Sequence, residues 1–264
     1  MKRLSFVVML SALLVPTLAA AQSAFNGTWK IDMSKVDFPE KPDVFVLQKG
    51  IYTCKTCAPP YTVKADGKDY AVKGHPYFDT VAIKVVDDHT IEETDKKAGK
   101  VVGNSHSAVS GDGDTLNFSF SDSSNTNGGP PVTGRGQATR VAKGPAGSAP
   151  ISGSWRTTGI QGMSENATVF SYKVSGEEIT MVAQTGQTYT AKLGGPDAPM
   201  SGDPGVTSVS VKMIGTNTLE ETDKRKGKVI GVFTMTVAEN GKSAKGSFDD
   251  KLQNKTTAFV ATKQ

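Results

Sequence analysis

The chain contains two copies of one segment, and this repeat limits its possible folds more than any other feature. The phrase "TIEETDKKAGKVVG" begins at Thr90, and "TLEETDKRKGKVIG" begins at Thr218, 128 positions later. With the same offset, residues 51–120 align with residues 179–248 without a gap. The sequence therefore predicts two homologous domains of roughly 115–125 residues each, which is a usual domain size.

The boundary between the two copies is marked by composition. The stretch "AKGPAGSAP" is rich in Pro, Gly, Ala and Ser, as linkers are. We place the first repeat at residues 22–143, the linker at residues 144–150 and the second repeat at residues 151–264.

The start of the chain has the layout of a secretory signal peptide. Lys2 and Arg3 precede an apolar run from Leu4 to Leu18, and three alanines follow. This pattern predicts cleavage between Ala21 and Gln22 and a periplasmic or secreted protein. The apolar run is shorter than the about 20 residues of a membrane-spanning helix, and no later stretch is long enough for one.

The charge of the mature chain gives no sign of a nucleic-acid partner. The whole sequence has 30 basic and 26 acidic residues, and removal of the signal peptide leaves 28 against 26. No stretch concentrates Lys and Arg, so we expect no nucleic-acid binding. The oligomeric state stays open.

Each copy has the pattern of β-strands. In "DTVAIKVVDD", the apolar residues Val81, Ile83 and Val85 alternate with others, and "TLNFSFS" alternates in the same way. Turn sequences such as "ADGKD" and "SGDGDT" separate these runs. Short β-rich runs between regular turns are typical of an all-β sandwich or barrel, here with about eight strands per copy.

The repeated phrase itself is predicted to be a hairpin. "TIEETD" reads as a strand, "KKAG" as a four-residue turn and "KVVG" as the returning strand. This register places Asp95 opposite Lys100 and Asp223 opposite Lys228. Each cross-strand charge pair is worth about 0.2–1 kcal/mol.

The orientation of the acidic residues in this hairpin has two interpretations. Glu93 and Asp95 share one face with Ile91. An exposed hairpin is the simpler interpretation, because a buried acid without a partner is costly. Alternatively, this face looks into a barrel, and Glu93 and Glu221 place carboxylates inside it.

The only cysteines, Cys54 and Cys57, are predicted to form a structural disulfide in an oxidising compartment. A redox-active pair or half of a metal site stays open as an alternative. Ala58 occupies the position of the histidine in a haem-attachment motif, so haem is not expected.

Both copies resemble calycins, the group of lipocalins and fatty-acid-binding proteins, at their ends. "FNGTWKIDMSKVDF" resembles the first calycin strand with its Gly-x-Trp signature, which recurs in the second copy at Gly153–Trp155. "GQATRVAKG" resembles the last strand, where an arginine packs over the opening tryptophan, and Arg140 takes this place. Ala142 replaces the tyrosine that holds a fatty acid, so that site is not carried over.

The resemblance implies two tandem antiparallel up-and-down β-barrels of the lipocalin-like type, with two β-sandwich domains as the alternative. It also implies a ligand cavity in each barrel. The candidate ligand-binding residues are Trp29, Tyr61, Glu93, Arg140, Trp155, Tyr189 and Glu221.

The predicted function is that of an exported lipocalin-like protein that binds a small, partly apolar ligand without catalysis. The sequence has no GxSxG nucleophile motif and no phosphate-binding glycine loop, so no cofactor is expected. The histidines His75, His89 and His106 have no metal-ligand spacing and are predicted to be loop or strand-surface residues. The alternative is a structural or interaction module of the envelope with filled barrels. Only the cysteine pair hints at an enzyme.

Overall fold

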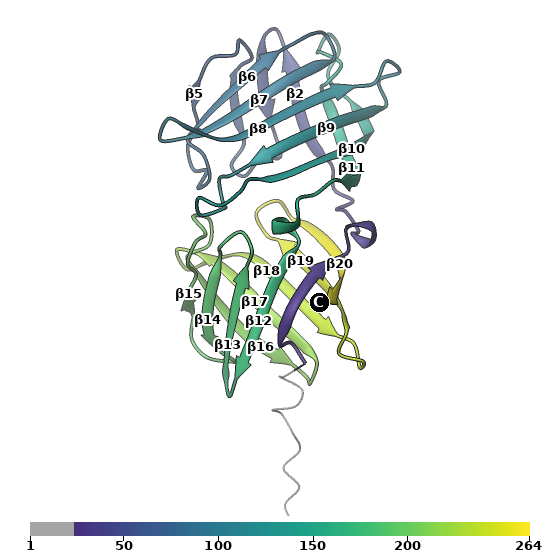
Figure 1. Ribbon diagram of the computed structural model, residues 1–264. Helices are drawn as coiled ribbons and strands as arrows, with labels where there is room; N and C mark the ends of the chain where they lie inside the picture. Colours follow the sequence, from purple (N-terminus) through teal and green to yellow (C-terminus); the bar gives the residue numbers. More distant parts are fainter. Residues whose placement is uncertain (1–23) are drawn as a thin grey trace, which may run out of the picture.

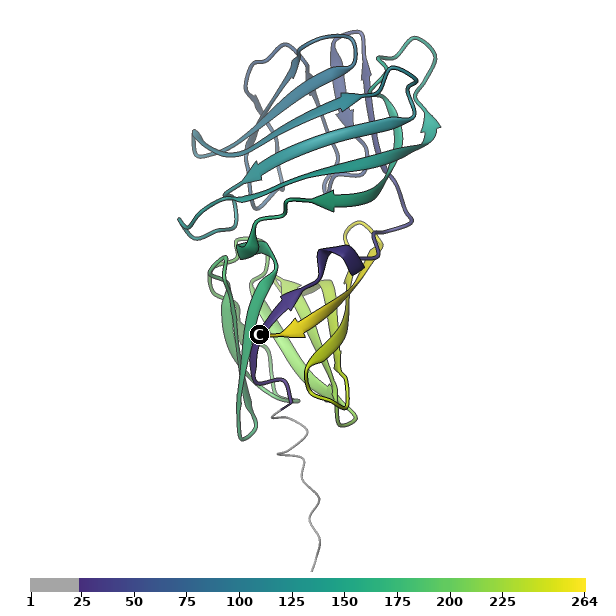
Figure 2. The same cartoon turned by 45° about the vertical axis from the view of Figure 1, so that its right-hand side comes forward.

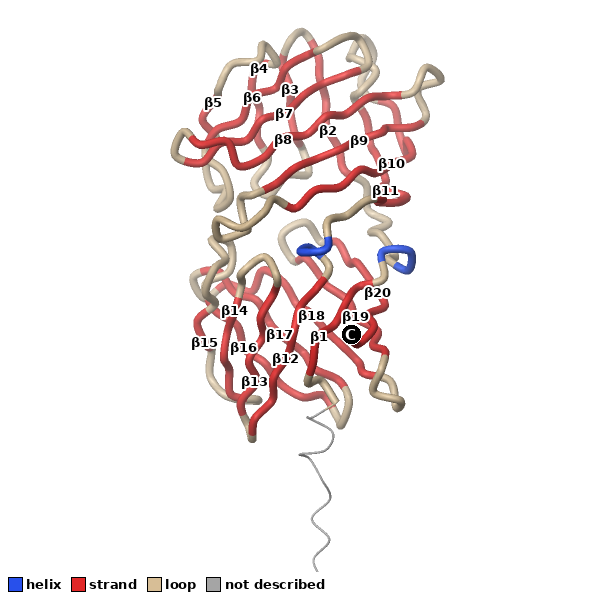
Figure 3. Tube along the Cα trace, in the orientation of Figure 1, coloured by secondary structure: helices blue, strands red, loops and turns tan. Residues whose placement is uncertain are grey.

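The protein consists of two antiparallel ten-stranded sheets, each curled into a nearly closed barrel (Figure 1). The computed structural model describes residues 24–264, so the predicted signal peptide lies outside the described residues. Within this range the helices are two three-residue 3-10 turns, η1 (Met33–Lys35) and η2 (Glu165–Ala167), shown in blue in Figure 3. None of the helical segments described could therefore span a bilayer.

The first barrel is one continuous segment, residues 43–161. In the order in which its strands pair, it contains β4 (Tyr61–Lys64), β3 (Ile51–Cys54), β2 (Asp43–Gln48), β11 (Gly153–Gln161), β10 (Val132–Lys143), β9 (Thr115–Asp122), β8 (Lys100–Val109), β7 (Thr90–Lys97), β6 (Thr80–Val85) and β5 (Tyr70–Ala71).

The second barrel is built from two separate segments. In pairing order, its strands are β14 (Thr188–Lys192), β13 (Glu178–Ala183), β12 (Val169–Ser175), β1 (Gly27–Ile31), β20 (Lys255–Lys263), β19 (Ser243–Asp250), β18 (Lys228–Val237), β17 (Thr218–Arg225), β16 (Ser208–Ile214) and β15 (Ala198–Pro199). Both sheets exceed the about eight strands predicted from turn spacing, partly because β5 and β15 are only two residues long.

Each barrel takes its opening strand from the other repeat. β1 lies between β12 and β20 of the second barrel, and β11 lies between β10 and β2 of the first. Figures 1 and 2 show β1, in purple, beside the yellow β20. The predicted division at residues 144–150 describes the sequence repeats and stays a prediction. The sheets themselves are divided at two crossover segments, residues 32–42 and 162–168.

The exchange is possible because the two opening strands make equivalent contacts. Trp29 and Trp155 are both at most 1% exposed. Each indole N–H donates to the carbonyl oxygen four residues earlier, Phe25 at 2.8 Å and Ile151 at 2.9 Å. Contact energy alone therefore does not decide which strand enters which barrel. The short connection from β10 to β11 favours pairing of these neighbours, as is usual for consecutive strands.

The exchange also changes the partner of Arg140. Its guanidinium carbon lies 4.0 Å from the ring centre of Trp155, the tryptophan of the second copy. In the second barrel, Lys263 takes the equivalent place, with Nζ 4.8 Å from the ring centre of Trp29. A cation over the opening tryptophan is thus found in both barrels, and in each the exchange sets which tryptophan it covers.

The hairpin of the repeated phrase has a tighter turn than predicted. Ala98 and Gly99 both have positive φ angles, 49° and 78°, which are typical of a two-residue type I′ turn. Lys97 therefore lies opposite Lys100. The pairing register also shifts between Asp95 and Lys96, and the predicted four-residue loop does not include this shift.

The predicted charge pairs across this hairpin are therefore wrong. Asp95 lies opposite Gly103 rather than Lys100. In the second copy, Asp223 lies opposite Gly231 rather than Lys228.

We predict that engineered cysteines will report the strand exchange. Thr28 lies opposite Ser171 across β1 and β12, so the pair Thr28→Cys and Ser171→Cys is expected to form a disulfide. In the first barrel, the counterpart of Thr28 is Ser154, which lies opposite Val44. Thr28→Cys with Val44→Cys therefore tests the unexchanged pairing. Peptide mapping by mass spectrometry should find the 28–171 link only, and a 28–44 link would contradict the exchange.

Candidate functional site

The acidic residues of the first copy of the phrase face the barrel interior. On β7, Glu93 lies on the same face as Ile91, which is 5% exposed, while Glu92 points outward and pairs with Lys84 at 3.0 Å. Tyr61 on β4 donates to Glu93 Oε1 at 2.8 Å from the other side of the interior. The exposed interpretation of this face is therefore wrong.

The second copy has the same arrangement in a more buried form. Glu221 and Asp223 are 6% and 8% exposed. Tyr189 donates to Glu221 Oε2 at 2.5 Å, as Tyr61 does to Glu93. The candidate residues Tyr61 and Glu93 are thus in contact, and so are Tyr189 and Glu221.

The last glycine of the phrase provides room for the aspartate. A Cβ atom on Gly103 would lie 3.1 Å from Asp95 Oδ2, and one on Gly231 would lie 3.4 Å from Asp223 Oδ2. A side chain at Gly103 would press on the carboxylate, whereas one at Gly231 would first meet the ring of Phe248, 2.6 Å away. The repeated phrase therefore encodes an interior Glu-x-Asp pair and the glycine opposite its aspartate.

Burial changes the protonation of this pair in the first barrel. Burial, and then the neighbouring charges of Glu93 and Asp122, raise the pKa of Asp95 to about 8. Burial also raises the pKa of Glu93, against the hydrogen bond from Tyr61. Asp95 is thus largely protonated at neutral pH. Its Oδ1 atom is buried and has no hydrogen-bond partner among residues 24–264.

The pair in the second barrel retains one proton at neutral pH, and Asp223 Oδ1, like Asp95 Oδ1, is buried without a hydrogen-bond partner in residues 24–264. Burial raises the pKa of Asp223 to about 6, and burial followed by the charge of Asp223 raises that of Glu221 well above its ordinary range. A hydrogen bond between the two carboxyl groups favours a proton on Glu221 and an ionised Asp223.

An aromatic wall lies beside the acidic pair of the first barrel. His75 stacks on Phe78 with ring centres 4.5 Å apart, and its ring meets the edge of Tyr61 at 5.7 Å. Burial lowers the pKa of His75, so its imidazole is neutral at neutral pH. Its Nε2 atom is buried without a partner in the described part of the chain.

His75 was not among the predicted site residues. It lies in the loop between β5 and β6, as predicted, but this loop brings it against Tyr61. The internal alignment contained a weak signal, because Gly74 and Pro76 recur as Gly202 and Pro204 while the residue between them changes.

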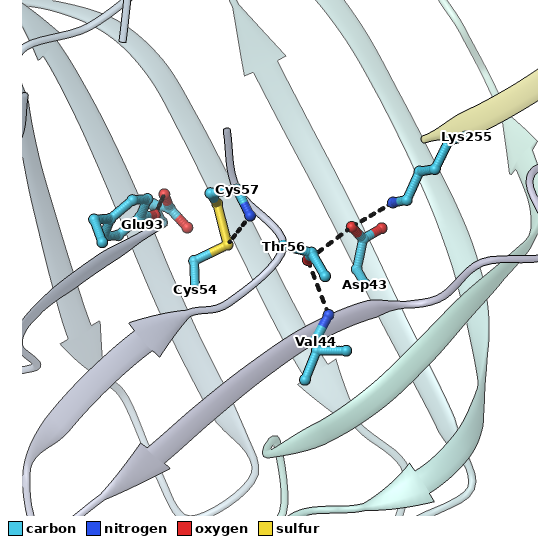
Figure 4. The surroundings of a disulfide bond; sticks show 8 residues. Asp43, Val44, Cys54, Thr56, Cys57, Glu93 and Lys255 are labelled. Carbon is cyan, nitrogen blue, oxygen red and sulfur yellow. Dashed lines mark hydrogen bonds and ion pairs between the residues drawn. A yellow bond between two sulfur atoms is a disulfide. The ribbon is translucent and has the colours of Figure 1, made fainter. Parts of the chain in front are cut away.

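The disulfide between Cys54 and Cys57 is confirmed. In Figure 4 this disulfide lies in the middle, with Glu93 to its left and Thr56 and Asp43 to its right. Both sulfurs are used, so the pair is not a metal ligand set in this state. No other cluster of metal-ligating side chains is found in residues 24–264.

The two barrels differ in what fills them beside the acidic pair. Ser105 lies opposite Glu93, whereas Phe233 lies opposite Glu221. One step along the strands, Ser107 of the first barrel takes the place of Met235 in the second. Two large apolar side chains are thus replaced by serines.

The first barrel therefore has smaller side chains than the second at the levels of Ser105 and Ser107. Ser105, Ser107 and Phe118 face inward by strand alternation, yet they keep partial exposure. At matching levels, Met235 is 0% and Phe259 is 7% exposed, while Phe233, the counterpart of Ser105, is also partly exposed. We define the lumen site as Tyr61, His75, Glu93, Asp95 and the two inward serines.

The remaining candidate residues belong to the closure of the barrels. Trp29 and Trp155 use their indole N–H groups on backbone carbonyls. Arg140 donates to the carbonyl oxygens of Ser152 and Pro150 at 2.7 and 2.6 Å. None of these hydrogen bonds reaches Tyr61 or Glu93.

Comparisons with known proteins leave the family open. No protein-family model matches the chain, and no curated protein matches it either. The barrels agree with the calycin resemblance at the level of shape, and the family itself is not shown.

We predict that Asp95→Asn stabilises the protein at alkaline pH. Because the pKa of Asp95 is about 8 in the folded state against an ordinary 3.8, the folded chain binds the extra proton between these values. The free energy of unfolding therefore falls as pH rises through this window. Asp95→Asn should remove this fall and raise the free energy of unfolding at pH 8 by about 1–3 kcal/mol.

Urea unfolding followed by circular dichroism at pH 5 and pH 8 measures this effect. Glu92→Gln, on the outer face of the same strand, is the control and should change stability by less than about 0.5 kcal/mol. A loss of stability at pH 8 in Asp95→Asn would contradict the assignment.

Proposed function

We propose that the protein binds a small, partly apolar ligand in the lumen of the first barrel. One observation carries the proposal: both barrels contain the acidic pair, but only the first has serines at the positions of Phe233 and Met235. An eight-stranded barrel is filled by side chains or holds one small ligand, and the same choice applies to these barrels.

The polar end of the ligand lies at Asp95 and His75. Asp95 Oδ1 and His75 Nε2 are buried polar atoms without partners in residues 24–264, and such atoms are costly. A ligand that forms hydrogen bonds to both atoms removes this cost. Protonated Asp95 can donate as well as accept, so an amide, an alcohol or an amine fits there.

The apolar part of the ligand lies against the aromatic wall. Tyr61, His75 and Phe78 present ring faces and edges next to the acidic pair. Ligand sites typically combine such apolar walls with a few polar groups that fix orientation.

For the second barrel, the observations favour the alternative function, a structural or interaction module with a filled interior. Its acidic pair is buried and internally hydrogen-bonded, and Met235 and Phe259 fill the neighbouring space. We propose that this barrel is a structural module that holds the first. Export through the predicted signal peptide stays a prediction, and it would place the ligand in the periplasm or outside the cell.

We predict that filling the lumen abolishes ligand binding. The double variant Ser105→Phe and Ser107→Met copies the second barrel into the first. It should reduce saturable binding of an apolar fluorescent dye at least about tenfold, because two large side chains occupy the site. Native mass spectrometry of protein from its own cell envelope should show a bound small molecule in the wild type only.

The control is Ser119→Met, on the outer face of β9, which should leave dye binding unchanged. Circular dichroism and melting temperature establish that each variant is folded. Equal dye binding by the filled variant and the wild type, or no ligand and no saturable binding in the wild type, would overturn the proposal.

A further inference from the structure

A pocket lies between the two barrels, and none of its lining residues belongs to the lumen site. Its volume is about 470 Å³. The first barrel contributes the loop after β3, residues 55–60, and the first crossover segment contributes Lys41. The second barrel contributes Arg225, Leu252 and Gln253. The pocket therefore exists only because the two barrels are held together.

The charged residues that line this pocket are all basic. Lys41, Lys55 and Arg225 line it, and no Asp or Glu does. Asp43 and Asp250, which line an adjoining pocket together with Lys41 and Gln253, are already engaged. Asp43 accepts from Lys255 at 2.6 Å, and Asp250 accepts from the backbone N–H of Leu252 at 2.8 Å.

The three cations have unused hydrogen-bond capacity. Lys41 Nζ donates to the carbonyl oxygen of Gln253 at 2.5 Å, and Arg225 Nε donates to that of Gly205 at 2.6 Å. Within residues 24–264, none of the three forms an ion pair with a carboxylate. Arg225 therefore keeps its two terminal nitrogens as donors, and Lys55 keeps its ammonium group.

We propose that this pocket binds a small organic anion through a phosphate or carboxylate head group. Like charges gathered in one cleft repel each other, and an oxyanion between them removes the repulsion. Arginine presents a planar fork that matches an oxyanion, and lysine adds a point charge. The volume lies within the about 300–1,000 Å³ that is typical of small-molecule sites.

The rest of the ligand contacts the apolar part of the same pocket. Pro59, Pro60 and the half-exposed Leu252 line it. An anion with a short carbon skeleton therefore fits better than an inorganic ion alone.

Binding at this pocket stabilises the arrangement of the barrels. Lys55 belongs to the first barrel, Arg225 to the second, and Lys41 to the crossover that joins them. An anion that contacts all three adds a bridge beside the ion pair of Asp43 and Lys255. This inference is independent of the lumen site, because it uses none of its residues.

The test is a titration of the full-length folded protein with pyrophosphate and, separately, with citrate. Both are followed by calorimetry and by melting temperature at low ionic strength. We expect saturable binding of at least one anion, a rise in melting temperature with its concentration, and weaker binding at 0.5 M NaCl. Binding of pyrophosphate alone or of citrate alone identifies the head group.

Arg225→Gln and Lys55→Gln should each weaken binding about fivefold to tenfold, because each removes a charged hydrogen-bond donor. Lys245→Gln, on the outer face of β19 and outside the pocket, is the control and should bind as the wild type does. Absence of saturable binding, or an equal loss in the control and in the two pocket variants, overturns the proposal.

Discussion

The burial of one tryptophan strand in each barrel is the interaction on which the rest of the structure depends. Trp29 and Trp155 are nearly inaccessible to water, and each lies under a cation from a neighbouring strand, Lys263 on β20 and Arg140 on β10. Because each tryptophan comes from the other repeat, neither repeat completes a barrel from its own residues. The exchange also forces the chain to cross twice between the barrels, and Lys41 of the inter-barrel pocket lies on the first crossing.

Inside this frame, the two barrels treat the same acidic pair differently. Burial of two carboxyl groups is tolerable when they are protonated and hydrogen-bonded, because the cost of burying a charge is then avoided. Tyr61 and Tyr189 each supply one such bond. In the second barrel, apolar side chains complete the packing around the pair. Asp95 and Asp223 each retain an unpaired Oδ1 atom, but only the first barrel adds the unpaired Nε2 of His75 and two inward serines, and this is the basis of the proposed ligand site.

Much of the fold follows from the sequence, and the exceptions have physical causes. Strand alternation predicts one face for Val81, Ile83 and Val85, and the first two are in the core while Val85, at the strand end, is 42% exposed. The cysteine spacing predicts the disulfide that is found. The hairpin turn was wrong because Ala98 adopts the left-handed region that usually takes glycine. The cost of burying an ionised carboxylate favours an exposed acidic face, but burial raises the pKa of Asp95 to about 8 and so removes that charge at neutral pH. The strand exchange leaves no local signal, since both repeats carry the same opening motif.

The contrast between the two copies is more informative about function than their similarity. The features that both copies share, the glutamate, the aspartate, the tyrosine and the glycine opposite the aspartate, serve the folding of either barrel. They are present in the filled second barrel, so they do not by themselves make a ligand site. The serines at positions 105 and 107 supply less apolar contact than Phe233 and Met235 supply in the second barrel. A chain that accepts this loss of packing in one barrel, and places the unpaired Nε2 of His75 there in addition to the unpaired aspartate oxygen that both barrels have, matches what a ligand site requires.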